Sequence, residues 1–263
     1  MPKPKAVAIV SGGLDSVTLA YLLGKKDIEA RIPWRAHEEQ PSSLREIFDL
    51  APQGYDLHLV SFNYGQRHKK ELEFAVLAAK RLGARHDIVD LSAVTPFLKG
   101  SSLTDAIEVP DGHYAAETMA ITVVPNRNAM MLAVAYAIAV AEGASIVAAG
   151  FHAGDHPIYP DCRPAFVEAF DAMERTATEG YAQPDLRLVT PFVEIGKHDI
   201  VETGVRLGVP YEETWSCYKG GERHCGRCGT DVERKEAFQL AGFPDPTDYE
   251  YPALDETLQG TLP

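Results

Sequence analysis

Three of the four cysteines lie within a dozen residues and have the spacing of a metal site. Cys217, Cys225 and Cys228 follow the pattern Cys-x7-Cys-x2-Cys. Clustered thiols in an intracellular chain indicate a metal before a disulfide, and these spacings are usual for structural zinc. A fourth ligand is required, and Asp231 continues the two-residue spacing after Cys228. We therefore expect Asp231 to complete the site, with His224, His198 or a water molecule as the alternatives.

A second group with the right chemistry lies near the N-terminus, between an apolar run at 6–10 and a segment with helical character. The serine-glycine-glycine-x-aspartate-serine run at 11–16 is not a Walker loop, which requires a lysine after the last glycine. Backbone N–H groups in such a turn, followed by a helix N-terminus, form an anion site. The pattern resembles the pyrophosphate loop of enzymes that adenylate their substrates, and the alternative is a glycine-rich turn without a ligand. The residues expected to bind ATP are Val10, Ser11, Gly12, Gly13, Leu14, Asp15, Ser16 and Val17.

Composition restricts the partners of this chain. It has 263 residues, 45% of them hydrophobic, and a formal net charge of −13. Because nucleic acid binding depends on lysine and arginine that displace counterions, a nucleic acid partner is not expected. No run of eighteen apolar residues and no signal-like N-terminus is recognised, so we expect a cytoplasmic protein without a membrane partner.

Elements expected along the chain alternate between strands and helices. Strands are expected at 6–10, 55–62, 86–91, 145–150 and 185–191, and helices at 16–23, 68–82, 129–141, 165–177 and 197–207. This alternation predicts a Rossmann-like, doubly wound parallel α/β sheet whose ligands lie at the carboxyl ends of the strands. The loops at 11–16, 63–68, 151–163 and 190–197 should therefore converge on one site.

Two segments do not fit the alternation. Residues 25–54 form too long a connection and are interpreted as a surface insertion, with one short helix at 42–48. Residues 92–123 form either a lid over the site or a plain surface loop. We expect a nucleotide-binding domain at 1–210 and a zinc-binding segment with the C-terminal tail at 211–263.

Several motifs together resemble the 7-cyano-7-deazaguanine synthase family, part of the pyrophosphate-loop ATPase group. Besides 11–16 they are Tyr-Gly-Gln-Arg-His at 64–68 with Glu71, 124–128, Asp155 with Tyr-Pro-Asp-Cys-Arg at 159–163, Lys197, and 214–218 with 225–229 and 233–238. The resemblance implies an adenine nucleotide alpha-hydrolase-like fold with a small C-terminal zinc-binding helical segment, and a homodimer. Two residues depart from the family pattern: Asp231 replaces a fourth cysteine, and Asn126 replaces a glycine.

The resemblance implies a ligase that converts 7-carboxy-7-deazaguanine and ammonia to a nitrile with ATP, Mg²⁺ and Zn²⁺, in queuosine biosynthesis. Free ammonia is the expected nitrogen source. Asp15, as a Mg²⁺ ligand or only a helix cap, and Lys197, as a phosphate partner or only a surface lysine, are the expected catalytic residues. Cys162 is expected to be a small buried residue rather than a nucleophile. The expected substrate-binding residues are Tyr64, Gln66, Arg67, Asn128, Asp155, Asp161 and Arg163.

Within that set, Arg67 and Arg163 suit the substrate carboxylate, and Asp155 or Asp161 suits the guanine-like edge. The alternative for each of these residues is an ordinary surface salt bridge. Two other functions remain open: transfer of the activated acid to a protein or nucleic acid acceptor, and a nucleotide-binding partner without catalysis.

Overall fold

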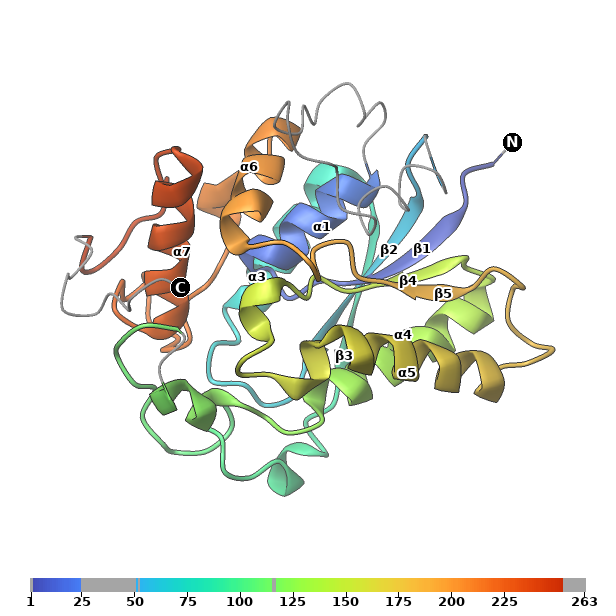
Figure 1. The fold of residues 1–263 in the computed structure, drawn as a ribbon, viewed down its shortest axis with the longest axis horizontal. Coiled ribbons are helices and arrows are strands. Elements are labelled where there is room, and N and C mark those ends of the chain that lie inside the picture. Colours follow the sequence, from blue (N-terminus) through green and yellow to red (C-terminus); the bar gives the residue numbers. More distant parts are fainter. Residues whose placement is uncertain (1, 25–50, 52, 115–116, 253–263) are drawn as a thin grey trace.

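The computed structural model describes residues 2–24, 51, 53–114 and 117–252 (Figure 1). The short helix expected at 42–48, and all of the expected insertion except residues 51, 53 and 54, lie outside the described residues.

Five parallel strands form one sheet in the order β3-β2-β1-β4-β5, which confirms the predicted doubly wound fold. The strands are β1 (Lys5–Ile9), β2 (Asp56–Asn63), β3 (Arg85–Asp90), β4 (Ile146–Ala148) and β5 (Arg187–Val189). Register is fixed by pairs such as Ala6 with Leu57 and Ala6 with Ile146. Strands β4 and β5 are shorter than expected, and their three residues pair along their full length.

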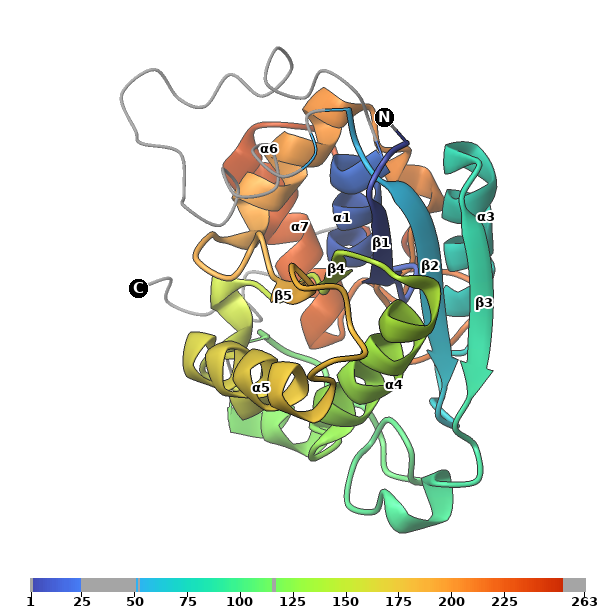
Figure 2. The same ribbon diagram turned by 90° about the vertical axis from the view of Figure 1, so that its right-hand side faces the viewer.

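Alternate residues of the strands face two different hydrophobic clusters, and helices cover both faces (Figure 2). In β1, Ala6 and Ala8 pack with α1 (Leu14–Gly24), α3 (Glu71–Leu82), α6 (Lys197–Leu207) and α7 (Gly229–Ala241). Val7 lies on the opposite face with α4 (Arg127–Glu142) and α5 (Pro164–Ala177). A parallel sheet buried on both faces explains why its strands read as continuous apolar runs.

Short 3₁₀ helices occupy the connections near the carboxyl ends of the strands. They are η1 (Thr95–Phe97), η2 (Glu117–Thr122), η3 (Ala153–Asp155), η4 (Pro160–Cys162) and η5 (Tyr211–Glu213).

Helix α7 joins the main core. Ala237 and Phe238 belong to the same buried cluster as Leu19 of α1. Arg234, almost fully buried, donates to the Tyr211 carbonyl at 2.8 Å and to Thr214 Oγ1 at 2.7 Å. The C-terminal segment is thus packed onto α6 and α1, while the division of the chain at 210 stays a prediction.

Residues Met119–Glu142, which include α4, are long and apolar enough to cross a membrane by length and composition alone. Core helices pass the same test. Leu132, Tyr136 and Ala139 of α4 are completely buried against the sheet, as in a core helix.

Candidate functional site

The loop at 11–16 folds as a compact anion cradle after β1. Ser16 Oγ accepts from the Ser11 amide at 3.2 Å, and Ser11 Oγ accepts from the Gly13 amide at 3.2 Å. Ser16 Oγ donates in turn to the Gly13 carbonyl at 3.1 Å. Helix α1 begins directly afterwards at Leu14, so its unpaired first N–H groups lie beside the loop.

Gly12 occupies a position that only glycine fits. Its φ is +99°, and a Cβ there would lie 2.0 Å from the carbonyl oxygen of Glu71 at the start of α3. The Gly12 carbonyl accepts from the Trp215 amide at 2.9 Å. The pyrophosphate-type loop is therefore held by α3 on one side and by the segment before the cysteines on the other.

A cavity of about 220 Å³ opens above this loop, at the carboxyl ends of the strands, as expected for a doubly wound sheet. Predicted site residues that line it are Val10, Ser11, Gly13, Leu14, Asp15, Ser16, Tyr64, Asn128, Asp155 and Lys197. Those outside the lining are Gly12, Val17, Gln66, Arg67, Asp161 and Arg163. Further wall residues come from 215–218 and from Tyr114, so the segment 92–123 contributes directly to the cavity.

One end of the cavity holds a cluster of three carboxylates around Lys197. The Lys197 Nζ lies 3.3 Å from Asp15 Oδ2 and donates to Glu233 Oε2. The third carboxylate is Asp155, which acts on Lys197 electrostatically. Burial lowers the pKa of Lys197, but Asp15, Glu233 and Asp155 outweigh it and raise that pKa above its ordinary value. Burial raises the pKa of Glu233, against the opposing effect of Lys197.

His152 lies among the same carboxylates and is almost fully buried. Its Nδ1 accepts from the Gly154 amide at 3.1 Å, so in the neutral ring Nε2 carries the hydrogen. That Nε2 lies 3.4 Å from Asp155 Oδ1 and 4.0 Å from Asp15 Oδ2. The imidazole therefore lies between the carboxylates of Asp155 and Asp15.

Four of the predicted substrate residues lie outside the cavity lining and have structural partners in the protein. Arg67 donates to the carbonyls of Asp105 and Ile107, and Arg163 donates to the His156 carbonyl. Asp161 accepts from the Asn128 amide at 3.1 Å, in the first turn of α4. Gln66 Oε1 accepts from the Tyr64 amide, and Gln66 Nε2 donates to the Phe62 carbonyl, which fixes the turn after β2. Their roles in substrate binding stay predictions.

The arginine that does line the cavity is Arg127, at the start of α4. It donates to Tyr64 Oη at 3.3 Å and to Asn128 Oδ1, and its guanidinium lies over the Tyr64 ring. Within the part of the chain that the structure describes, no carboxylate pairs with it. Asn128 in turn donates to the sulfur of Cys162, which is buried as predicted.

Asn126, immediately before Arg127, is the single non-glycine residue with positive φ among the described residues. Its φ of 63° lies in the left-handed region, which asparagine tolerates better than most residues. The departure from glycine thus keeps the backbone turn that begins α4.

The cavity wall also contains Glu71, whose side chain is 11% exposed. Gln66 Nε2 donates to Glu71 Oε1 at 3.0 Å, and His68 Nε2 lies 3.5 Å from the same oxygen. Burial raises the pKa of Glu71 to about 7, although Gln66 and Arg127 oppose the shift. Burial, with the charges of Arg127 and Arg67, lowers the pKa of His68 to about 3, so His68 is neutral.

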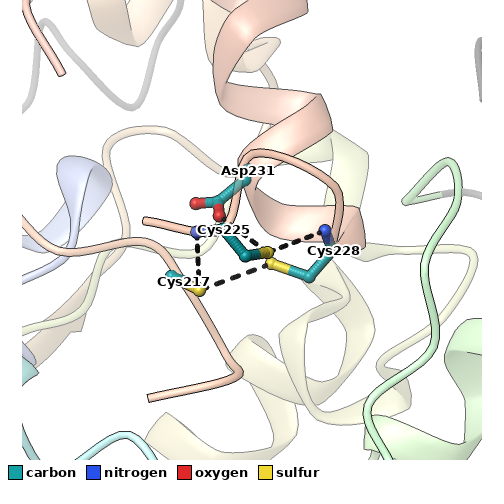
Figure 3. A group of neighbouring side chains, drawn as sticks. All are labelled: Cys217, Cys225, Cys228 and Asp231. Atoms are coloured by element: carbon teal, nitrogen blue, oxygen red, sulfur yellow. Dashed lines mark hydrogen bonds between the residues drawn. The ribbon is translucent and has the colours of Figure 1, made fainter. Parts of the chain in front are cut away.

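The cysteine cluster lies at the N-terminus of α7, where Cys217, Cys225, Cys228 and Asp231 point toward one centre (Figure 3). Their four donor atoms lie within 4.8 Å of one another, and all four residues are buried. Two of the sulfurs, on Cys217 and Cys228, are 4.0 Å apart. That separation is twice a disulfide bond and close to the roughly 3.8 Å between thiolates of a tetrahedral zinc site.

Of the two histidine alternatives for the fourth ligand, His198 lies beside Asp199, and His224 contacts Asp231. His198 Nε2 lies 3.4 Å from Asp199 on α6. His224 Nδ1 lies 3.1 Å from Asp231 Oδ1, while the other carboxylate oxygen, Oδ2, is 3.3 Å from Cys225 Sγ. His224 therefore orients the carboxylate, a common arrangement around metal ligands.

The cysteine segment also builds the cavity. Trp215, Ser216, Tyr218 and Thr230 line it, and Thr230 Oγ1 donates to the Ser216 carbonyl at 2.8 Å. Cys217 lies between Ser216 and Tyr218 in the chain, and Cys228 lies two residues before Thr230. The cysteine cluster is thus close to the cavity wall, although none of its four residues lines the cavity.

Sequence reasoning did not assign several residues that the fold brings to the cavity. Tyr114 lines it from the segment 92–123, and Glu233 of α7 contacts Lys197 in its wall. No local sequence pattern predicts either contact. Arg127, Glu71 and Glu233 lie inside motifs that carry the family resemblance, which was the available signal. His152 lies in the loop after β4, at the carboxyl end of the strand, where ligands of such a sheet are expected.

Comparison with known proteins assigns the family. Residues 43–242 match the queuosine biosynthesis protein QueC family. This chain belongs to that family. A relative from Allorhizobium ampelinum is 54% identical over 94% of this chain and 93% of its own, and one from Paracoccus denitrificans is 54% identical with the same coverage. Both relatives are named 7-cyano-7-deazaguanine synthase.

Solved structures resemble this QueC-family chain more distantly. The NMN synthetase from Francisella tularensis is 18% identical, with a TM-score of 0.46 over 92% of this chain and 79% of its own. A similarity at this level supports no statement about function.

Proposed function

We propose that this chain is an ATP-dependent 7-cyano-7-deazaguanine synthase, which joins ammonia to 7-carboxy-7-deazaguanine and carries the product on to the nitrile. The observation that carries the proposal is the cavity that joins the Ser11–Ser16 cradle to the guanidinium of Arg127, which no carboxylate of the described residues pairs with. Relatives that match nearly the full length of the chain carry the same name.

The reaction needs activation because a carboxylate would have to expel an oxide. Transfer of AMP to the acid supplies a good leaving group, ammonia then gives the amide, and a second activation of the amide oxygen allows elimination to the nitrile. Each activation releases pyrophosphate. The N–H groups of the loop at 11–16 suit this anion, because its negative charge grows as the bond to the α-phosphate breaks.

Asp15 and Lys197 suit the neutralisation of the negative charge on the phosphates of ATP. Asp15 Oδ1 is buried and has no hydrogen-bond partner among the described residues, which fits a Mg²⁺ ligand bound together with nucleotide oxygens. Bound there, Mg²⁺ would neutralise charge on the phosphates. Lys197 holds its proton firmly, so its ammonium group can donate a hydrogen bond to a phosphate oxygen at the same end of the cavity.

Arg127 is the best-placed partner for the carboxylate of the substrate. A guanidinium presents paired N–H donors that match a carboxylate, and here no protein carboxylate occupies them in the described chain. Asp155, in the cavity with one oxygen held by Tyr114, suits the donor edge of the guanine-like base. Arg67, Arg163 and Asp161 would have to reorient to contact the substrate.

The cysteine cluster suits Zn²⁺ in a structural role. Three thiolates and one carboxylate at these separations match a closed four-coordinate site. Its contribution would be to hold residues 215–218 against the cavity. The homodimer, the cytoplasmic location and the independence from nucleic acid expected from the sequence remain predictions of this proposal.

The test is to incubate the purified protein with ATP, Mg²⁺, ammonium and 7-carboxy-7-deazaguanine and to follow products by mass. Nitrile with AMP and pyrophosphate is expected. Arg127→Gln should raise the KM for the acid by at least about tenfold, the cost of one charge-assisted contact, with little change in the KM for ATP. Arg175→Gln, at an exposed arginine on α5, is the matched control.

Two outcomes would contradict the proposal. Adenylate or amide without nitrile would favour transfer of the activated acid to another acceptor. Absence of any nucleotide turnover would favour a binding partner without catalysis. A larger KM effect from Arg163→Gln than from Arg127→Gln would restore the assignment made from sequence.

A further inference from the structure

Glu71 is a buried carboxylate that the phosphate and substrate contacts above leave unused. It begins α3, lines the cavity, and its backbone carbonyl packs against Gly12 of the pyrophosphate-type loop. Arg127 lines the same cavity and acts electrostatically on Glu71. A group bound at Glu71 would therefore share one cavity with the loop that holds ATP and with the arginine that suits the substrate carboxylate.

Only one oxygen of Glu71 has a protein partner. Gln66 and His68 both contact Oε1, and no hydrogen bond to Oε2 forms within the described residues. A carboxylate that only caps a helix would have its oxygens on backbone N–H groups, but no backbone amide of the described residues donates to the Glu71 side chain. Oε2 is the atom left for a ligand.

The surroundings of Glu71 favour a small cation that can lose a proton. Tyr64, Trp215 and Tyr218 line the same cavity and present aromatic rings. The titratable groups that interact with Glu71 are Tyr64 and His68 from the loop after β2 and Arg127 from α4. Of these only Arg127 carries charge near neutral pH, because burial raises the pKa of Tyr64 to about 12 and lowers that of His68 to about 3.

The proposed reaction has a need that this carboxylate meets. Ammonia in neutral solution is almost entirely ammonium, whose nitrogen has no free electron pair to attack a carbonyl. A base inside the cavity must remove a proton before the carbon–nitrogen bond can form. A carboxyl group with a pKa near 7 is far better suited to this than one at its ordinary value of 4.5.

The geometry points to Glu71 as the residue that binds ammonium and deprotonates it beside the acyl adenylate. This inference rests on the proposed function. One N–H bond of ammonium breaks, its electron pair stays on nitrogen, and the proton forms an O–H bond with Glu71 Oε2. The nitrogen then attacks the carbonyl, AMP leaves with the electrons of its C–O bond, and a second proton passes from nitrogen to water. Glu71 returns its proton to solvent before the next turnover.

The experiment compares wild type, Glu71→Gln and Glu73→Gln. Gln keeps the acceptor that receives the Gln66 amide, and Glu73 is an exposed carboxylate in the same helical turn, so Glu73→Gln is the matched control. Three rates are measured: acid-dependent ATP–pyrophosphate exchange, product formation with ammonium over a range of pH, and hydroxamate formation with hydroxylamine. Hydroxylamine is mostly unprotonated at neutral pH and needs no base for this step.

Glu71→Gln should keep exchange and hydroxamate formation within about threefold of wild type. Its ammonium-dependent rate at neutral pH should fall by about 100-fold or more, a usual contribution of a general base. That deficit should shrink by about tenfold for each unit of rising pH, because the fraction of free ammonia in solution rises by that factor.

Equal loss of all three rates in Glu71→Gln would overturn the inference and assign Glu71 a structural role. So would an ammonium-dependent deficit that stays constant with pH. Absence of exchange in the wild type would instead refute the proposed function itself, which separates the two failures.

Discussion

At the residue scale, Asp231 replaces a thiolate by a carboxylate without disturbing the cluster around it. Gly226 donates its amide to Asp231 Oδ2 at 2.9 Å, and His224 contacts Oδ1. These partners satisfy a fully buried carboxylate that would otherwise be costly to bury. The replacement is therefore accommodated by neighbours that supply the orientation an oxygen ligand needs.

Asp231→Ala should remove one of four metal ligands. We expect zinc affinity to fall by more than about 100-fold and the Tm to fall as well. Loss of a residue that only hydrogen-bonds to a metal ligand costs up to about 100-fold, and loss of the ligand itself should cost more. Asp231→Cys should keep the metal. Zinc content after dialysis against a chelator, and thermal unfolding, measure both effects. Asp248→Ala, at an exposed aspartate, is the control, and unchanged zinc content and Tm in Asp231→Ala would contradict the assignment.

The sequence alone did not show which arginine lines the cavity. Arg67 and Arg127 both lie in motifs that follow strands or begin helices, and both could face a ligand. Gly65, with φ of 80°, and the bonds of Gln66 turn the chain so that Arg67 points to the carbonyls of Asp105 and Ile107. That direction depends on the turn and on a distant segment, and neither can be derived from the motif.

At the element scale, the strands and helices were predictable because burial dictates their sequence. The apolar runs of β1 and β2 are buried on both faces, and α6 begins and ends where predicted. The contribution of α7 to the cavity was not predictable in the same way. Glu233 reaches Lys197 only because α7 packs on α6, a contact between elements with no sequence signal of its own.

Gly12→Ala tests how tightly the loop and α3 are packed. A Cβ at positive φ costs about 1–2 kcal/mol wherever it occurs. At Gly12 it would also collide with the backbone of Glu71 and Ala75, which cannot rotate away. We expect urea unfolding to show Gly12→Ala at least about 2 kcal/mol less stable than Gly83→Ala.

Gly83 is the matched control, because its φ is 61° and nothing lies within 4 Å of an added Cβ. Equal losses at the two positions would show that the loop can move away from α3.

At the scale of the whole molecule, Glu71 makes global stability depend on pH. Its pKa rises from 4.5 unfolded to about 7 folded, so between those values the native state binds more protons than the unfolded state. Stability from this group is therefore lost as pH rises from 4.5 to 7 and does not change further above that.

Glu71→Gln removes this dependence. The free energy of unfolding of the variant, relative to wild type, should increase by roughly 3 kcal/mol between pH 4.5 and pH 7 and then level off. Urea unfolding at a series of pH values measures it, with Glu73→Gln expected to show no such trend. A relative stability that decreases over this range would mean that the carboxyl is charged more easily in the folded protein.

The contact between Gly12 and α3 has a practical consequence for protein engineering. A nucleotide loop of this kind is a short contiguous sequence and invites transfer to another scaffold. Its shape, however, depends on the Glu71 carbonyl and on the Trp215 amide, which lie some 60 and 200 positions further along the chain. Grafting residues 10–17 alone would transfer the amino-acid sequence of the loop without its backbone conformation. A transferable module would have to include β1, α1, the first turn of α3 and the stretch around Trp215.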